Sequence, residues 1–376
     1  MKVRIELQRI QLGFMIAGVC AGGALSQGDA DFGFDFVTIG DPGNRDTTPE
    51  ESTFSEFNFQ GPIMGGVDYE FRMARLELTV EQHFEFVVAY LPFYEKRTGH
   101  VFGFSFFVGD GIRTAFGVAS IREGISLNRP SDMSWEYLAR YVNWLHHGKV
   151  VEAWAFDSGV YDTSTFTQND DGTWNHQAAH NPEARYWIPT LDEWVKAAHW
   201  DPDKDNGMGG YWIFQNSSDI EPIPGLLPSE GGERNAGDEG FPLDVGSFPD
   251  VISPWGMLDM AGGIDEFTET PVEGRGLFTR RMKGTVYFDD LYGFDMSRDI
   301  LGVAREGAVV LCGTLRLTTG LFHPADLNQD GQVNYFDISM FIRLFAAGDE
   351  RADFRLDGAF DIDDVRVFLG LMSGSA

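Results

Sequence analysis

The sequence predicts an α+β fold that is rich in loops and is followed by a small all-α module. Three observations predict it. Apolar residues at helical spacing are confined to a few segments, with short apolar runs between them. Glycine contributes 45 of the 376 residues, which indicates many turns. The C-terminal part contains an internal repeat, in which an acidic loop precedes an apolar helix.

The N-terminus has the features of a secretory signal. A basic start, an apolar stretch and a small-residue cleavage site follow one another at Lys2, Arg4 and Arg9, at 12–24, and at Ala24-Leu25-Ser26. We therefore expect residues 1–26 to be a signal peptide that is cleaved near Ser26, and the mature protein to be secreted. The apolar stretch is too short to cross a bilayer, so no transmembrane anchor is expected.

The composition is strongly acidic. The formal charge of −30 argues against nucleic acid or an anionic membrane as a partner. The same charge attracts cations such as calcium, although solubility alone is an alternative explanation for it. Of the two cysteines, Cys20 lies in the apolar leader, so only Cys312 is left and no internal disulfide is expected.

The larger part of the chain begins with an exposed N-terminal segment at 27–61, because 40–61 is rich in Pro, Gly, Asp, Thr and Ser. A short strand is predicted at 66–71. Apolar spacing predicts three helices, at 78–90, 132–146 and 190–199. The third has a capping-box signature, since Thr190 is followed by Glu193.

The C-terminal module, 323–374, contains two loops of alternating acidic residues. In the first loop, oxygen-bearing side chains fall at positions 1, 3, 5, 7, 9 and 12 of an EF-hand-like loop: Asp326, Asn328, Asp330, Gln332, Asn334 and Asp337. Gly331 at position 6 permits the sharp turn that such a loop requires. The pattern predicts a calcium site, and a simple Asn/Gly turn is the structural alternative.

The second loop begins 27 residues later and is less complete. Its carboxylates occupy positions 1, 5, 9 and 12: Asp353, Asp357, Asp361 and Asp364. Arg355 stands at position 3, where a ligand is expected, and a guanidinium cannot coordinate a cation. Two alternatives remain open, a weaker calcium site or an Arg355–Asp361 pair in place of the metal.

The paired loops resemble a dockerin type I module, in which position 12 is also Asp rather than Glu. That resemblance implies a protein partner of the cohesin type. The apolar residues after each loop either pack the two halves together or face the partner: Ile338, Phe341, Ile342, Leu344 and Phe345, and Val365, Val367, Phe368 and Leu369.

Three blocks of the larger part occur in the order and spacing of the formylglycine-generating (sulfatase-modifying-factor) family. They are YWIPTLDEWVKAAHWDP at 186–202, VGSFPDVISPWGMLDMAGGIDEFTET at 245–270 and RRMKG at 280–284. The chain resembles a domain of that family over 36–319. The resemblance implies a C-type-lectin-like fold with few helices, small sheets and long loops held by metal ions.

The family's own reaction is not expected here. The family oxidises a substrate cysteine with a pair of copper-binding cysteines, and residues 284–311, where the resemblance places that pair, contain no cysteine. Thiolates select copper(I), and oxygen or imidazole ligands do not replace that chemistry. We therefore expect no catalytic residue. His176 and His180 lie four residues apart, but the nearby Gly172 and Pro182 favour a loop over a metal-binding helix.

The family resemblance also implies two structural calcium sites. The first is matched loosely by Asn235 and Glu239 with the carbonyls of Ala236 and Phe241, and the second by Glu266 with the carbonyls of Gly262 and Ile264. An exposed acidic loop is the alternative for the first site.

Three functions fit these observations. The first is a secreted, calcium-dependent binding or scaffold protein, whose larger part binds a glycan or a protein. Trp154, Trp174 and Trp212 are candidates for stacking on sugars. The second is an oxidoreductase that uses residues other than cysteine. The third is an accessory role in extracellular polysaccharide degradation.

Overall fold

The computed structural model describes residues 32–51, 53–54, 59–60, 63–98, 111–115, 118–168, 174–175, 177–220, 222–223, 229, 231–233, 243–260, 262–271, 279–284, 300–303, 313–321, 325–327, 333–355 and 359–373. Within them the protein is a mixture of helices and small open sheets, which confirms the predicted α+β class. The expected signal peptide and Cys312 lie outside the described residues.

The largest sheet joins segments that are far apart in the sequence. Its four antiparallel strands have the order β1-β4-β15-β9. These strands are β1 (Phe36–Ile39), β4 (Phe71–Ala74), β15 (Thr318–Thr319) and β9 (Tyr186–Trp187). Thr318 lies opposite both Met73 and Trp187, so the end of the larger part is inserted between its beginning and its middle.

A second sheet has three antiparallel strands, in the order β12-β13-β14. They are β12 (Glu266–Pro271), β13 (Thr279–Lys283) and β14 (Ile300–Val303). The remaining strands form two-stranded pairs: β2 (Thr53–Phe54) with β3 (Phe59–Gln60), β5 (Ile112–Ala115) with β6 (Val118–Ile121), β7 (Thr167–Gln168) with β8 (Trp174–Asn175), and β10 (Trp200–Asp201) with β11 (Gly210–Tyr211).

The three predicted helices are present as α1 (Val80–Thr98), α2 (Trp135–His146) and α4 (Leu191–His199). The capping box of α4 is formed, because Thr190 Oγ1 accepts from the Glu193 N–H at 3.1 Å and Glu193 Oε2 accepts from the Thr190 N–H at 2.7 Å. The short helices α3 (Ala153–Asp157) and α5 (Lys204–Gly207) were not expected.

Two details of the N-terminal prediction are wrong. The strand expected at 66–71 begins at Phe71, because the preceding loop is held by Asn44, whose Oδ1 accepts from the Val67 N–H at 3.1 Å. The expected exposure of 40–61 also fails in part, since Asn44 and Thr47 are buried. Asn44 Nδ2 donates to Tyr211 Oη at 2.8 Å, so long-range hydrogen bonds compensate its burial.

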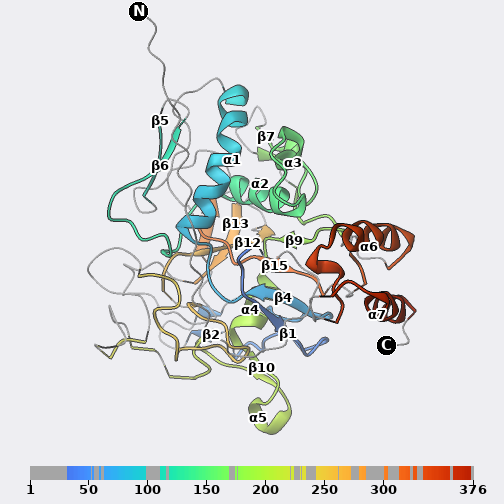
Figure 1. Ribbon diagram of the computed structural model, residues 1–376. Helices are drawn as coiled ribbons and strands as arrows, with labels where there is room; N and C mark the ends of the chain where they lie inside the picture. The colour runs from blue at the N-terminus through green and yellow to red at the C-terminus, as the bar shows by residue number, and fades with distance from the viewer. Residues whose placement is uncertain are drawn as a thin grey trace, which may run out of the picture.

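The core of the larger part packs α1, α2 and α4 against the sheets. It is rich in aromatic side chains, and Trp135, Trp144 and Trp194 are fully buried. Phe86 of α1 stacks on Tyr90 with ring centroids 5.5 Å apart. Figure 1 shows α1 and α2 above the β1-β4-β15-β9 sheet, and α4 at the level of β4 and β1.

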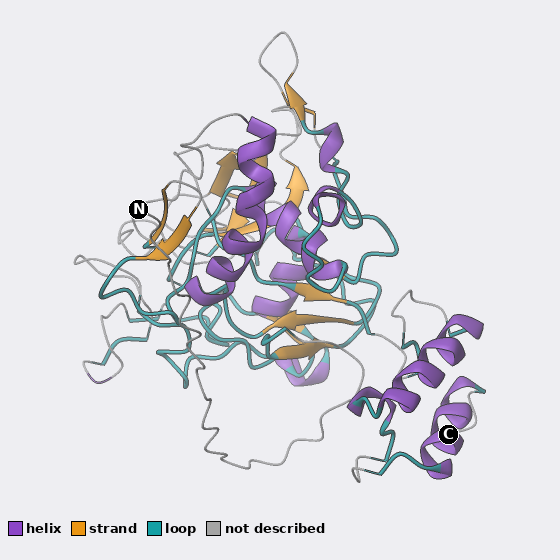
Figure 2. Ribbon diagram, turned by 45° about the horizontal axis from the view of Figure 1, so that its top comes forward, coloured by secondary structure: helices purple, strands orange, loops and turns teal. Residues whose placement is uncertain are grey.

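The C-terminal residues form a separate hydrophobic cluster. Helices α6 (Tyr335–Ala347) and α7 (Ile362–Met372) lie side by side and away from the sheets (Figures 1 and 2). Helix α6 ends at Gly348, whose φ of 65° is the left-handed conformation that glycine adopts readily. The buried members of this cluster are Ala325, Phe341, Leu344, Ala352 and Phe368.

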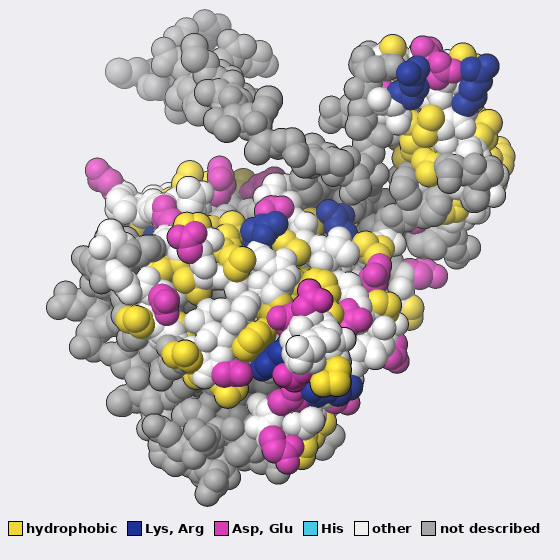
Figure 3. Space-filling view, turned by 90° about the horizontal axis from the view of Figure 1, so that it is seen from below, with side chains coloured by type: hydrophobic (Ala, Val, Ile, Leu, Met, Phe, Trp, Pro, Cys, Tyr) yellow, Lys and Arg dark blue, Asp and Glu magenta, His cyan; other side chains and the backbone are white. Residues whose placement is uncertain are grey.

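No helix in the described part of the chain is long and apolar enough to cross a membrane. Figure 3 shows Asp and Glu side chains scattered over one face of the molecule, with hydrophobic side chains between them. The acidic side chains that are visible on this face are thus spread out and not gathered in one patch.

Candidate metal centres

The two C-terminal loops place equivalent aspartates in equivalent, buried positions. The first and last predicted ligands of the first loop, Asp326 and Asp337, are 2% and 0% exposed. Their counterparts in the second loop, Asp353 and Asp364, are 7% and 1% exposed. Buried carboxylates at matching positions of the two repeats are the arrangement that a pair of calcium loops requires, so both loops are candidate cation sites.

The predicted ligands at positions 9 and 12 of each loop lie at the N-cap and in the first turn of the following helix. In the first loop the Asn334 N–H donates to Asp337 Oδ2 at 2.8 Å, and in return Asn334 Oδ1 accepts from the Phe336 N–H at 2.8 Å. In the second, the Asp361 N–H donates to Asp364 Oδ2 at 2.9 Å. Both helices therefore start with a capping box built from predicted ligands.

Arg355 at position 3 of the second loop has two distinct contacts. Its guanidinium forms an ion pair with Asp363, 3.2 Å from Nη1 to Oδ2, and both side chains are well exposed. Its backbone N–H donates to Asp364 Oδ1 at 3.1 Å. The second loop therefore closes on its last carboxylate, Asp364, through the backbone of Arg355. The side chain of Arg355 takes no part in this contact.

The other predicted calcium ligands lie outside the described residues. They are Asn328, Asp330, Gln332 and Asp357 in the two loops, and Asn235 and Glu239 in the larger part. Within the described part of the chain, no three His, Cys, Asp or Glu side chains are gathered in a way that could hold a metal ion.

Glu266, the remaining predicted ligand, is described and fully buried. It forms an ion pair with Arg316, 2.6 Å from Nη2 to Oε1, and accepts from Trp194 Nε1 at 2.5 Å. Burial opposes the charge of Arg316, but the contact with Glu266 outweighs it and raises the pKa of Arg316. The arrangement thus gives Glu266 a permanent positive partner inside the protein.

Two further acids near this pair were not predicted. Burial and the charge of Glu266 raise the pKa of Glu77 well above its ordinary value. Burial likewise raises the pKa of Asp259, against the opposing hydrogen bond from the Gly246 N–H. Glu77 and Glu266 are far apart in the sequence, so neither spacing nor periodicity could have found this cluster.

A second group that sequence reasoning missed surrounds Glu269. Its carboxylate accepts from Tyr161 Oη at 2.7 Å and lies 3.0 Å from His180 Nδ1. His180 is outside any helix, as its neighbours predicted, and its ring stacks on Trp187 at 4.8 Å. His176 lies outside the described residues.

The charge state of His180 follows from these contacts. Burial lowers the pKa of the imidazole, but the hydrogen bond and charge of Glu269, with the charge of Glu193, outweigh burial and raise it. A carboxylate-oriented imidazole of this kind can take up or release a proton near neutral pH. Its partner is 89 residues away in the sequence, which explains why His180 was not paired with it.

The chain matches no protein-family model, and no curated protein matches it. Distant similarity to solved structures was found. The crystal structure of CarF is 17% identical with a TM-score of 0.45, and the match covers 77% of this chain and 98% of CarF. The Treponema denticola variable protein 1 is 13% identical with a TM-score of 0.44, covering 77% and 95% of the two chains. PvdO from Pseudomonas aeruginosa is 14% identical with a TM-score of 0.37, covering 76% and 94%.

Proposed function

We propose that this chain is a secreted, calcium-dependent binding protein. Its C-terminal loops form a dockerin-like module that docks onto a cohesin-like partner. That module carries a non-catalytic part with the C-type-lectin-like fold of the formylglycine-generating family. The observation that carries the proposal is the matching burial of Asp326 with Asp337 and of Asp353 with Asp364.

The residues at both loops fit calcium. A buried carboxylate is costly unless hydrogen bonds or a cation compensate it, and calcium prefers carboxylate and carbonyl oxygens. When bound, the ion would neutralise the aspartates at positions 1 and 12 of each loop. The capping boxes at Asn334 and Asp361 start the helix that follows each loop, so ion binding and helix position would be coupled.

The surface of α6 and α7 supports a docking role. Large apolar side chains are exposed at equivalent places of the two repeats: Tyr335 with Ile362, and Ile342 with Leu369. Their exposed fractions are 73% and 60% for the first pair, and 60% and 50% for the second. Apolar side chains that recur on the outside of both helices are expected where another protein packs.

A glycan is the proposed ligand of the larger part. Trp154 of α3 is 53% exposed, and the His147 ring meets it in a T-shaped contact with centroids 4.7 Å apart. An exposed indole held in this way offers a flat apolar face to a sugar ring. Trp212 is less available, since its Nε1 donates to Asp201 Oδ2 at 2.9 Å. This ligand class also supports an accessory role in polysaccharide degradation.

Binding of the full-length protein to an immobilised cohesin domain tests the proposal. We expect binding in calcium and none after chelation. Replacing Ile342 and Leu369 together by Lys should abolish binding. The control is Val118→Lys, because Val118 is 65% exposed but lies on β6 of the larger part. Binding of the Ile342/Leu369 variant with unchanged affinity would contradict the docking surface.

A further inference from the structure

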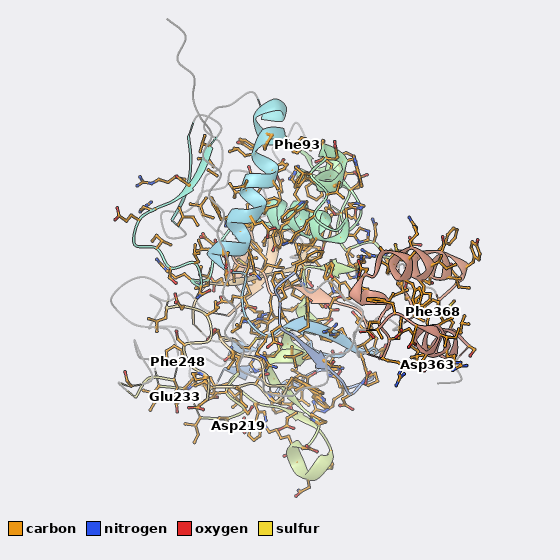
Figure 4. The ribbon with its side chains drawn as sticks, viewed as in Figure 1. Phe93, Asp219, Glu233, Phe248, Asp363 and Phe368 are labelled. Atoms are coloured by element: carbon orange, nitrogen blue, oxygen red, sulfur yellow. The ribbon has the colours of Figure 1, made fainter. Side chains whose placement is uncertain are left out.

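A small cavity lies beneath loops of the larger part, away from the C-terminal module. The centre of a water molecule can move within about 10 Å³ of this cavity. That is room for one water or one ion. Its walls include four oxygen-bearing side chains and apolar neighbours: Gln215, Asn216, Glu233 and Asp259, with Phe248 and Met260. Figure 4 shows Glu233 and Phe248 on neighbouring loops, far from Phe368 of the C-terminal module.

Two neutral acceptors in this wall have no donor within the described protein. They are Gln215 Oε1 and Asn216 Oδ1, both buried at the atom. Gln215 as a whole is only 4% exposed. A buried acceptor without a donor is uncommon in a folded protein and calls for an explanation such as a bound ion or water. Here two such acceptors stand on consecutive residues.

The two carboxylates of the wall are each held by a backbone N–H group. Glu233 Oε2 accepts from the Ile223 N–H at 3.0 Å, and Asp259 Oδ2 accepts from the Gly246 N–H at 2.5 Å. No Lys, Arg or His side chain is among the described residues that line the cavity. The cavity therefore gathers oxygen acceptors of both neutral and anionic kinds.

We infer that this cavity binds a hard divalent cation, and specifically calcium. Calcium takes oxygen ligands from carboxylates, amides, carbonyls and water in a flexible arrangement, whereas zinc and copper favour nitrogen or sulfur. The donor set shares no residue with the C-terminal loops or with Asn235, Glu239 and Glu266. The inference is independent of the proposed docking function.

A cation at this place would connect parts of the chain that share no sheet. Gln215 follows β11, Glu233 lies in an irregular segment, and Asp259 precedes β12. The protein has only two cysteines, so disulfides give these loops little support. One ion bound to all three segments would supply a cross-link that the secondary structure does not.

The test counts calcium ions bound to the full-length protein by native mass spectrometry, with affinity measured by calorimetry. Glu233→Gln should remove one ion from the count, or weaken one site by about tenfold or more, because affinity follows the number of charged ligands. Asp250→Asn is the matched control. It removes the same charge from an exposed residue beside Val251, which lines the cavity, and should leave the count unchanged.

A second variant covers the case in which Glu233→Gln does not fold. Gln215→Glu adds a third carboxylate, which should tighten calcium binding at one site by about tenfold. Around a bound water, the same change would instead lower the melting temperature equally with and without calcium, and this result overturns the inference. An unchanged ion count together with unchanged affinities in Glu233→Gln also overturns it. Asp326→Asn and Asp353→Asn should leave calcium binding in this cavity intact. Loss of the cavity site can therefore be distinguished from loss of the C-terminal calcium sites.

Discussion

Phe341 of α6 and Phe368 of α7 stack face to face, with ring centroids 4.2 Å apart and 6° between the ring planes. They occupy equivalent positions of the two repeats and are 4% and 1% exposed. This contact joins the helices that follow the two candidate calcium loops. Figure 4 places Phe368 between α6 and α7, at the centre of the C-terminal cluster.

Removing one ring of this stack should loosen the whole C-terminal cluster. Phe368→Ala is expected to cost about 3–5 kcal/mol of unfolding free energy, because a buried aromatic ring is replaced by a cavity. Hydrogen exchange of the α6 and α7 amides is the measurement. Tyr335→Ala is the control, since Tyr335 is 73% exposed and its loss should leave exchange nearly unchanged. Equal protection of the α6 and α7 amides from exchange in wild type and Phe368→Ala would show that the Phe341–Phe368 stack does not hold the two helices together.

The buried pair of Glu266 and Arg316 should be sensitive to which partner is removed. Arg316→Met leaves Glu266, Glu77 and Asp259 buried without their cation, so we expect a loss of about 3–5 kcal/mol in urea unfolding. Glu266→Gln should lower the unfolding free energy by less, because Arg316 still interacts with the nearby acids Glu77 and Asp259.

The matched control for that pair is Lys149→Met. It breaks the ion pair with Glu85, which is 52% exposed, and should cost no more than about 1 kcal/mol. An equally small effect of Arg316→Met would show that the acids around Glu266 are not held by Arg316.

The contact between His180 and Glu269 predicts a pH dependence. The folded-state pKa of His180 is raised above its ordinary value of 6.5. The folded state therefore holds the proton more tightly than the unfolded state. The contribution of the His180–Glu269 contact to the unfolding free energy is thus fully present below pH 6.5. It is lost as the pH rises through the folded-state pKa. The difference in unfolding free energy between wild type and His180→Gln should shrink over that range, and a difference that grows with pH would contradict the pair.

The capping box of α4 predicts a small stabilisation by the Thr190 hydroxyl, which can be measured separately from the packing of the Thr190 methyl group. Thr190→Ala should cost about 1 kcal/mol, because the Glu193 N–H loses its side-chain acceptor. Thr190→Ser keeps a hydroxyl at the same position and should retain most of the stability in thermal unfolding. A loss in Thr190→Ser as large as that in Thr190→Ala would assign the effect to packing of the Thr190 methyl group instead of the cap.

The parts of the fold that depend on neighbouring residues could be predicted from the sequence. Helix α4 is an example, because Thr190 and Glu193 lie three residues apart and the cap is complete within one turn. The capping boxes at Asn334 and Asp361 are of the same kind. Spacing within each repeat also placed Asp326 and Asp337 at matching positions, which the structure shows to be buried alike.

Contacts between distant residues could not be predicted in this way. Strand β4 begins later than expected because Asn44, which is remote from it in sequence, holds the preceding loop. Arg316 pairs with Glu266 across 50 residues, and Glu269 holds His180 across 89. The unsatisfied oxygens of Gln215 and Asn216 become visible only when burial is known. Their residue types alone are those of an ordinary surface turn.

Calcium binding by the full-length protein decides whether the two C-terminal loops are calcium sites. Calorimetry should be run on the wild type, on Asp326→Asn/Asp353→Asn, and on Asp349→Asn as a control for an aspartate between the two loops. We predict that the double variant loses the calcium sites of the C-terminal loops and that Asp349→Asn keeps them, because both position-1 carboxylates are buried with their loops. The same number of ions and the same affinities in all three proteins would contradict it.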